Sequence, residues 1–130
     1  FLNEHIDLLL QEYIKIDYDI RVLVSNGEVM ASMKRNVMSD DIRSNASLGA
    51  KTESIELTDI EKEVSLKVAK LVDGDLVGVD LLPAKNRETE QPYILEVNGT
   101  PGLGGIEEVT KGKSVTQEIF KTYLNRENWR

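Results

Sequence analysis

The stretches LVGVDLL (Leu76–Leu82) and YILEVN (Tyr93–Asn98) alternate in the way expected of two β-strands. Side chains along a strand point to opposite faces with a period of two. Each stretch therefore has one apolar face and one face with carboxylate or amide oxygens, supplied by Asp80 in the first and by Glu96 and Asn98 in the second. If the strands pair antiparallel, Asp80 lies opposite Glu96 and Asn98 lies next along, so three oxygen ligands converge.

Converging oxygen ligands predict a site for a hard divalent cation. Two carboxylates side by side are unfavourable unless one is protonated or a cation lies between them. An oxygen-only set suits Mg2+ or Mn2+ rather than zinc or copper, and Mg2+ keeps several positions for water and phosphate. The alternatives are that Asp80 and Glu96 bind calcium, or lie on a solvated face without a ligand. Asp80 lies in an apolar run, where an unpaired carboxylate is costly, and this disfavours the solvated face.

The dipeptide Asn26-Gly27 between two alternating stretches predicts a type I′ hairpin that joins strands Asp19–Ser25 and Glu28–Lys34. In the register that this turn sets, Asp19 lies directly opposite Lys34. The core face then carries Ile20, Val22, Val24, Val29, Ala31 and Met33, and the other face carries Asp19, Arg21 and Lys34. The local positive charges available to a phosphate group are Lys15, Arg21, Lys34 and Arg35.

Two capping boxes predict helices in the rest of the chain. Thr58 and Glu61 form the first box, and the helix that follows has Ile60, Val64, Val68 and Leu71 at core spacing. Ser114 and Gln117 form the second box, before a last helix with Val115, Ile119 and Tyr123 inward. We also expect the end of a helix at Leu2–Leu10, an extended piece at Gln11–Ile16, and loops at residues 39–50 and 99–105. The pattern predicts one α+β domain over residues 1–130, a mostly antiparallel sheet with helices packed on one face.

The composition excludes several kinds of chemistry. The 130 residues include no cysteine and a single histidine, so disulfides, thiolate metal sites, cysteine nucleophiles and histidine-cluster metal sites are ruled out within the chain. A net charge of −7 disfavours non-specific nucleic-acid binding, and no apolar stretch is long enough for a membrane span. Since the first residue is Phe1, we expect the sequence to be the interior of a longer protein.

Five motifs in order resemble those of the ATP-grasp ligases, with the closest likeness to the RimK-like branch, whose best-known members add glutamate to a ribosomal protein. The resemblance covers the chain from about Gln11 to Phe120. The motifs are Gln11-Glu12-Tyr13-Ile14-Lys15, Asp19-Ile20-Arg21, Arg43-Ser44-Asn45, Gly78-Val79-Asp80-Leu81-Leu82 and Glu96-Val97-Asn98-Gly99-Thr100-Pro101-Gly102-Leu103.

The resemblance implies a role for each matching residue. The adenine edge would be bound by backbone groups of Glu12, Tyr13 and Ile14, and the nucleotide would be contacted by Asp19, Arg43, Ser44 and Asn45. The metal ligands would be Asp80, Glu96 and Asn98, with Glu96 bridging two Mg2+ ions. Arg35 resembles a phosphate-facing arginine, whereas the hairpin register favours Lys34 for the site face. That choice stays open, and Arg35 and Arg43 are the implied catalytic cations.

The implied reaction is amide formation that consumes ATP and needs Mg2+ or Mn2+. A substrate carboxylate would take the γ-phosphoryl group as an acyl phosphate, and an amine would then displace phosphate. The implied partners are an amino acid, a peptide or a protein acceptor, in the cytoplasm, and an oligomer of the full-length protein stays open. The other ATP-clamping subdomain is expected to precede Phe1, so the chain alone should bind nucleotide weakly and not turn over. The alternative is a nucleotide-binding module that has lost turnover.

Overall fold

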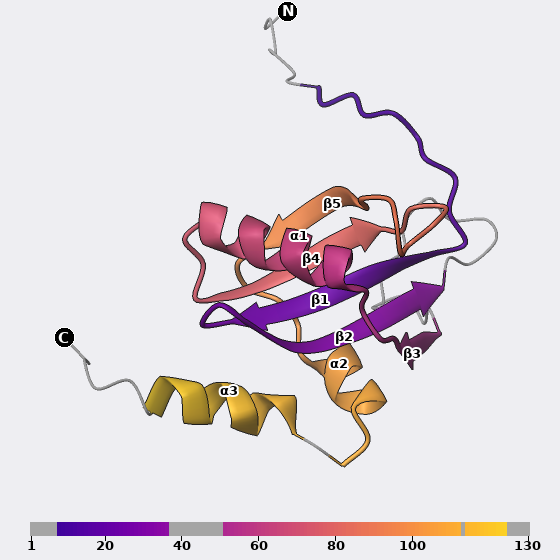
Figure 1. Ribbon diagram of the computed structural model, residues 1–130. Helices are drawn as coiled ribbons and strands as arrows, with labels where there is room; N and C mark the ends of the chain where they lie inside the picture. Colours follow the sequence, from indigo (N-terminus) through magenta and orange to yellow (C-terminus); the bar gives the residue numbers. More distant parts are fainter. Residues whose placement is uncertain (1–7, 37–50, 113, 125–130) are drawn as a thin grey trace, which may run out of the picture.

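The computed structural model describes residues 8–36, 51–112 and 114–124, which form an antiparallel five-stranded sheet in the order β3-β2-β1-β4-β5. The elements are β1 (Tyr18–Ser25), β2 (Glu28–Asn36), β3 (Thr52–Ser54), α1 (Asp59–Leu71), β4 (Leu76–Leu82), β5 (Tyr93–Asn98), α2 (Gly104–Val109) and α3 (Val115–Leu124) (Figure 1). The predicted α+β class with a mostly antiparallel sheet is confirmed. No helix within these ranges is long and apolar enough to cross a membrane.

A β-bulge in the hairpin of β1 and β2 changes the predicted register. The turn itself is as expected, since Asn26 and Gly27 both have positive φ, 55° and 76°. Val24 pairs with Val29, but Leu23 pairs with Ala31, which leaves an extra residue on β2. Beyond the bulge every partner is moved by one residue. The prediction that Asp19 lies opposite Lys34 is therefore wrong.

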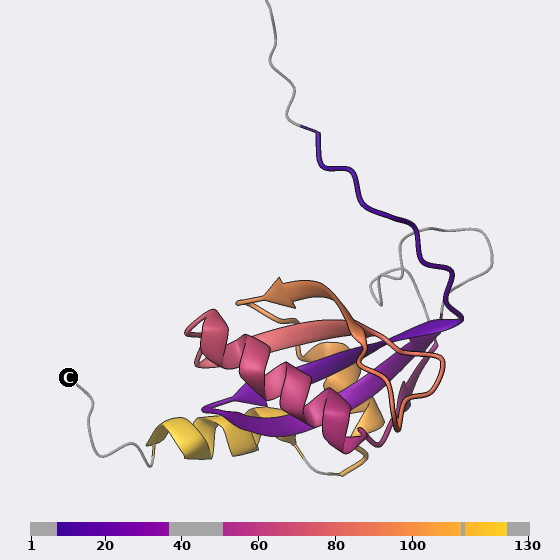
Figure 2. The same ribbon diagram turned by 45° about the horizontal axis from the view of Figure 1, so that its top comes forward.

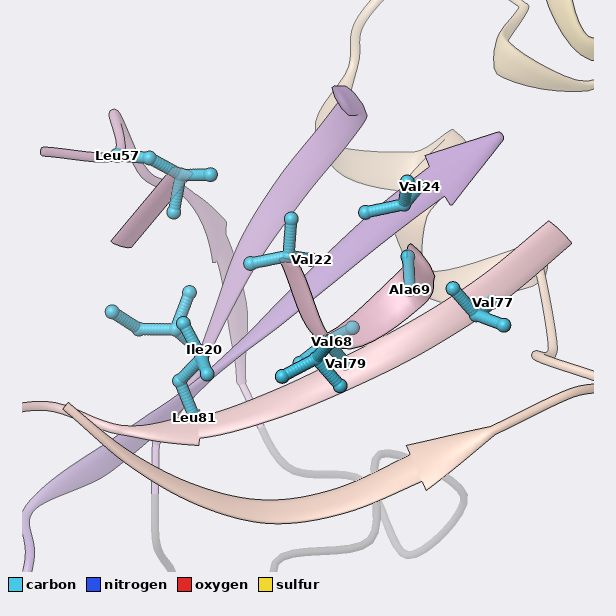
Figure 3. Close-up of a cluster of buried hydrophobic side chains, with 9 residues drawn as sticks. All are labelled: Ile20, Val22, Val24, Leu57, Val68, Ala69, Val77, Val79 and Leu81. Carbon is cyan, nitrogen blue, oxygen red and sulfur yellow. The ribbon is translucent and has the colours of Figure 1, made fainter. Parts of the chain in front are cut away.

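Helices cover both faces of the sheet, not one. On one face α1 packs over a cluster of buried side chains, drawn in Figure 3: Ile20, Val22, Val24, Leu57, Val68, Ala69, Val77, Val79 and Leu81. On the other face α2 and α3 cover Leu23, Met33, Ile106, Val115 and Ile119. Figure 2 shows α1 in front of the sheet and α2 behind it. The bulge explains why Ala31 and Met33 join the second cluster, whereas the simple register had placed them with Ile20.

The first capping box is formed as predicted, and it starts α1. The Thr58 side chain accepts from the Glu61 backbone N–H, and the Glu61 carboxylate accepts from the Thr58 N–H. The buried residues near the end of the helix are not the ones that the core spacing predicted. Leu71 is 77% exposed, while Ser65 and Ala69 are buried. The prediction of Leu71 as a core residue is wrong, because two residues of helix turn the chain by about 200°, which puts Leu71 on the side opposite the buried Ala69.

The segment before β1 is extended. Residues 8–10 are not helical, so the part of the predicted first helix that falls within the described residues is absent. Both views show residues 8–17 running away from the sheet (Figures 1 and 2). Leu8, Leu9 and Leu10 are accordingly exposed.

Candidate functional site

Four charged side chains gather on the sheet face that α2 and α3 partly cover. Arg21 of β1 pairs with Asp80 of β4, and Asp19 of β1 pairs with Arg35 of β2. Arg21 and Asp19 lie two residues apart on β1, so both point to the face that Leu23 also occupies. That face is thus apolar at one end and ionic at the other.

The Asp80 carboxylate forms ion pairs with two guanidinium groups, those of Arg21 and Arg35. Arg21 Nε donates to Oδ1 at 2.8 Å and Arg21 Nη2 donates to Oδ2 at 2.7 Å, which is a bidentate pair. Arg35 Nη2 lies 2.9 Å from the same Oδ2. Arg35 in turn forks onto Asp19, with Nε to Oδ1 and Nη2 to Oδ2 both at 2.7 Å. Asp19 is 0% exposed, and Arg35 and Asp80 are each 3% exposed, so this network lies inside the protein.

The charges in this network stabilise one another. Burial alone would raise the pKa of Asp80, but hydrogen bonds from Arg21 and the charge of Arg35 outweigh it, so that the pKa lies below its ordinary value. Burial would likewise lower the pKa of Arg35, but Asp19 and Asp80 raise it overall. At neutral pH Asp80 is therefore an ionised carboxylate, the form that a metal ion or a cationic group requires.

The predicted pairing of the two acidic strands is confirmed. Asp80 lies opposite Glu96, and Gly78 lies opposite Asn98. A bulge follows between Asp80 and Leu81, next to Glu96. Glu96 is exposed, and the Oδ1 atom of Asn98 accepts a hydrogen bond of 2.8 Å from the Thr100 backbone. The strand alternation puts Asp80, Glu96 and Asn98 on one face.

Gly78, which lies opposite Asn98, allows Pro101 and Arg21 to approach the β4 backbone closely. A Cβ atom on Gly78 would lie 3.0 Å from Cβ of Pro101 and 3.8 Å from Nε of Arg21. Within the described ranges no group of three or more His, Asp or Glu side chains is arranged to hold a metal ion. The paired strands β4 and β5 place two carboxylates and one amide on one face, an oxygen set that fits Mg2+.

Of the two rival cations, Arg35 reaches the site face and Lys34 does not. The bulge turns Lys34 toward the α1 face, where its Nζ lies 4.6 Å from the centroid of the Tyr18 ring and 4.0 Å from the Glu53 carboxylate. The register argument that favoured Lys34 for the site face is wrong for this reason.

The remaining predicted residues are not brought to the network. Glu12, Tyr13 and Ile14 belong to the extended segment before β1, and Tyr13 is 69% exposed. Figure 1 shows that segment leading away from the sheet. Arg43, Ser44 and Asn45 lie outside the described residues, so their place relative to Asp80 stays a prediction.

Sequence reasoning missed Arg21 as the partner of Asp80. Arg21 was expected on the same face as Asp19, but no local signal sets the pairing of β1 with β4, which are joined through the intervening hairpin strand and helix. One usable signal was present. A carboxylate inside the apolar run of β4 needs a buried cation or a metal, and Arg21 alternates with apolar residues in the same way.

Comparison with known proteins identifies the family to which the chain is similar. The family profile described as RimK-like ATP-grasp domain matches residues 2–122. Two similar curated proteins are the probable alpha-L-glutamate ligase of Aeromonas salmonicida (strain A449) and the probable alpha-L-glutamate ligase 1 of Shewanella sp. (strain W3-18-1). The first is 37% identical over 93% of this chain and 40% of its own length, and the second is 41% identical over 93% and 39%. This chain thus spans about two fifths of these relatives.

A solved structure supports the fold. ATP-grasp ligase PsnB, in complex with minimal precursor, Mg and ADP, superposes with a TM-score of 0.62 and 18% identity, over 85% of this chain and 34% of that one. At this identity the likeness concerns the fold alone.

Proposed function

The chain belongs to the RimK-like ATP-grasp family, and from that premise we propose that the protein containing it is an ATP- and Mg2+-dependent carboxylate–amine ligase. The observation that carries the proposal is the pairing of Asp80 with Glu96 across β4 and β5, beside a buried arginine network. Acids placed opposite each other on one sheet face disfavour each other's charged form, and a metal ion between them would offset this effect. The presence of both acids, together with Asn98, counts against the alternative of a nucleotide-binding module that has lost turnover.

The proposed metal ligands are Asp80, Glu96 and Asn98. When bound, Mg2+ would neutralise triphosphate charge and hold phosphate oxygens in place. Asp80 presents an ionised carboxylate from β4, the strand next to the edge, while Glu96 is exposed on the edge strand β5. Glu96 would therefore complete the site from the side where substrates enter, and bridge a second ion if two are bound.

The proposed reaction has two steps. A carboxylate oxygen of the donor substrate attacks the γ-phosphorus of ATP, the bond to the bridging oxygen breaks, and acyl phosphate and ADP result. An amine of the acceptor then attacks the acyl carbon, phosphate leaves, and the amine loses a proton to give the amide. Arg35 supplies fixed positive charge beside Asp80, and Arg43 with Ser44 and Asn45 is proposed to contact the nucleotide or the acyl phosphate.

Asp19 and the hinge are given different roles in this proposal. Asp19 is fully buried and accepts two hydrogen bonds from the Arg35 guanidinium, so we assign it to holding Arg35 in place, not to touching nucleotide. The backbone of Glu12, Tyr13 and Ile14 is proposed to bind the adenine edge. That role requires the segment before β1 to fold back toward the sheet when nucleotide binds.

The substrates are proposed from the relatives. The Aeromonas and Shewanella proteins are named probable alpha-L-glutamate ligases, and the PsnB structure contains a precursor. We therefore propose glutamate as one substrate and a peptide or protein as the other, with no role for nucleic acid or membrane and a cytoplasmic location.

A chimera tests this function. The matching segment of the Aeromonas salmonicida ligase is exchanged for this chain, and the product is assayed with ATP, glutamate and a peptide acceptor. We expect ADP release and peptide that is heavier by one glutamate residue. Glu96→Gln should lower the rate by about 100-fold or more, a loss typical of removing a group that stabilises transition-state charge. Because Glu96 is exposed, the variant should still fold.

The matched control is Glu28→Gln, another exposed glutamate, at the hairpin end of β2, which should keep full activity. A folded chimera that binds ADP but makes no amide would instead support the module without turnover. Equal activity of the Glu96 and Glu28 variants would remove Glu96 from the proposed site.

A further inference from the structure

The bidentate grip of Arg21 on Asp80 leaves little room for another ligand on that carboxylate. A carboxylate offers about four lone-pair positions to donors or metals. Asp80 Oδ1 already accepts from Arg21, and Oδ2 accepts from Arg21 and lies beside Arg35. In this arrangement most lone pairs of the Asp80 carboxylate already accept hydrogen bonds, and few remain to coordinate a cation.

The charges of the network also disfavour binding of a cation at Asp80. Asp19 and Asp80 balance Arg21 and Arg35, so the formal charges of the network cancel. A divalent cation arriving alone meets a network without net negative charge, with Glu96 opposite Asp80 on β5, and it is repelled by two guanidinium groups. A polyphosphate that arrives with the cation changes this, because its oxygens give the arginines another partner.

The two arginines differ in how firmly they are held. Arg35 is forked onto Asp19 by two hydrogen bonds of 2.7 Å, and its side chain is 4% exposed. The Arg21 side chain is 14% exposed and lies nearer to the open side of the network. Its guanidinium packs beside the Gly78 backbone, because a Cβ atom on that glycine would lie 3.8 Å from Arg21 Nε. Arg21 is therefore the arginine that can leave Asp80 without unfolding the core.

Resting on the proposed function, we propose that Arg21 is a positioning residue that keeps Asp80 from binding a cation until polyphosphate is present. Metal and nucleotide then bind cooperatively, because each is favoured by the release of the Arg21–Asp80 pair. By linkage, the factor by which nucleotide strengthens metal binding equals the factor by which metal strengthens nucleotide binding. Arg35 stays with Asp19 and keeps the carboxylate in position throughout.

The proposal is tested by titrating this chain with Mn2+ in the absence of nucleotide. The electron paramagnetic resonance signal of free Mn2+ decreases as the ion binds, and this decrease measures the affinity. Arg21→Gln should bind Mn2+ more tightly than the natural chain by roughly tenfold, within the usual range of coupling between neighbouring sites. Lys67→Gln removes one positive charge from the exposed side of α1, on the opposite sheet face, and should leave the affinity unchanged. Equal Mn2+ affinities of Arg21→Gln and the natural chain would overturn the proposal.

The double variant Arg21→Gln/Asp80→Asn separates this proposal from the metal site itself. If the gain from Arg21→Gln is lost in the double variant, the cation binds at Asp80 and both proposals stand. If the gain persists, the cation binds elsewhere, and the ligand set of the proposed function fails together with this inference. Should Arg21→Gln fail to fold by circular dichroism, Arg21→Lys replaces it. The lysine variant cannot fork onto Asp80 and should show a smaller gain, whereas no gain would again overturn the proposal.

Discussion

Arg21 and Asp80 lie directly opposite each other on β1 and β4 and share two hydrogen bonds, of 2.8 and 2.7 Å. The strands that hold them come from distant parts of the chain, so the pair forms only when the sheet is complete. Arg35 and Asp19 extend the pair into a buried, charge-balanced network. The stability of the sheet and the chemistry proposed for it thus depend on the same side chains.

Arg35→Gln should lower the free energy of unfolding by about 3 kcal/mol, because it strips a buried aspartate of its bidentate partner. Asp19, at 0% exposure, is the buried residue that loses both hydrogen bonds from Arg35. Urea denaturation followed by circular dichroism measures the change. Lys34→Gln is the neighbouring control, with a side chain 29% exposed, and should cost less than about 1 kcal/mol. Equal losses for both variants would show that the buried network adds no special stability.

Gly78→Ala should destabilise the protein by about 1 kcal/mol, since the added Cβ meets a buried neighbour. It would lie 3.0 Å from Cβ of Pro101, and the loop after β5 must shift to relieve the contact. Gly102→Ala, in the same loop, meets nothing within 4 Å and should be close to neutral. Thermal denaturation compares the two variants. If Gly78→Ala leaves the stability unchanged, the loop after Asn98 moves away from the added Cβ atom at no cost in free energy.

Arg87→Ala should cost about 2 kcal/mol, because the arginine makes charge-assisted hydrogen bonds to a buried acid. It donates to both carboxylate oxygens of Glu61, at 2.8 and 2.7 Å, and to the Glu56 carbonyl at 2.8 Å. Glu61 is 1% exposed and keeps its capping bond to Thr58 in the variant. The exposed Lys85, in the same connector, is the control for Ala substitution. Chemical denaturation should show a loss for Arg87→Ala only.

The docking of α3 should weaken in acid through Glu107. Hydrogen bonds from the Thr116 hydroxyl and backbone, with a further one from Ser114, hold the pKa of Glu107 below its ordinary value. A depressed folded-state pKa gives stability that is complete above the unfolded pKa of about 4.3 and is lost as the pH falls through the folded value. Glu107→Gln should therefore lose stability at about pH 7 and lose less on acidification than the natural chain.

Urea midpoints at about pH 7 and about pH 3, on either side of that pKa, measure this difference. Glu108→Gln is the adjacent control and should follow the natural chain at both pH values, because Glu108 is exposed. Parallel pH curves for Glu107→Gln and the natural chain would remove Glu107 from the anchoring of α3.

Local signals in the sequence were enough to predict most elements. The bounds of β4 and β5 are those expected from alternation, and the Asn26-Gly27 turn has the predicted dihedral signs. The capping box at Thr58 starts α1 as expected. Each of these features depends on residues close together in the chain, which is why a pattern could reveal it.

Features set by long-range packing were not predictable in the same way. The bulge opposite Leu23 has no marker in the hairpin sequence, yet it decides that Arg35 and not Lys34 reaches the site face. The short helix α2 begins at Gly104, inside a stretch whose glycines favoured a loop. Its buried residue Ile106 packs with Leu23 and Met33, so tertiary contact outweighs the low helix propensity of glycine.

The central claim is that Asp80 and Glu96 hold the metal of a ligase site, and a crystal of this chain soaked with Mn2+ and ADP tests it most directly. The account predicts an anomalous Mn2+ peak between the two carboxylates, at roughly 2.0–2.6 Å from their oxygens, with Asn98 in reach and Arg21 moved off Asp80. A peak at another place on the molecule, or none while Arg21 still forks onto Asp80, would contradict the claim.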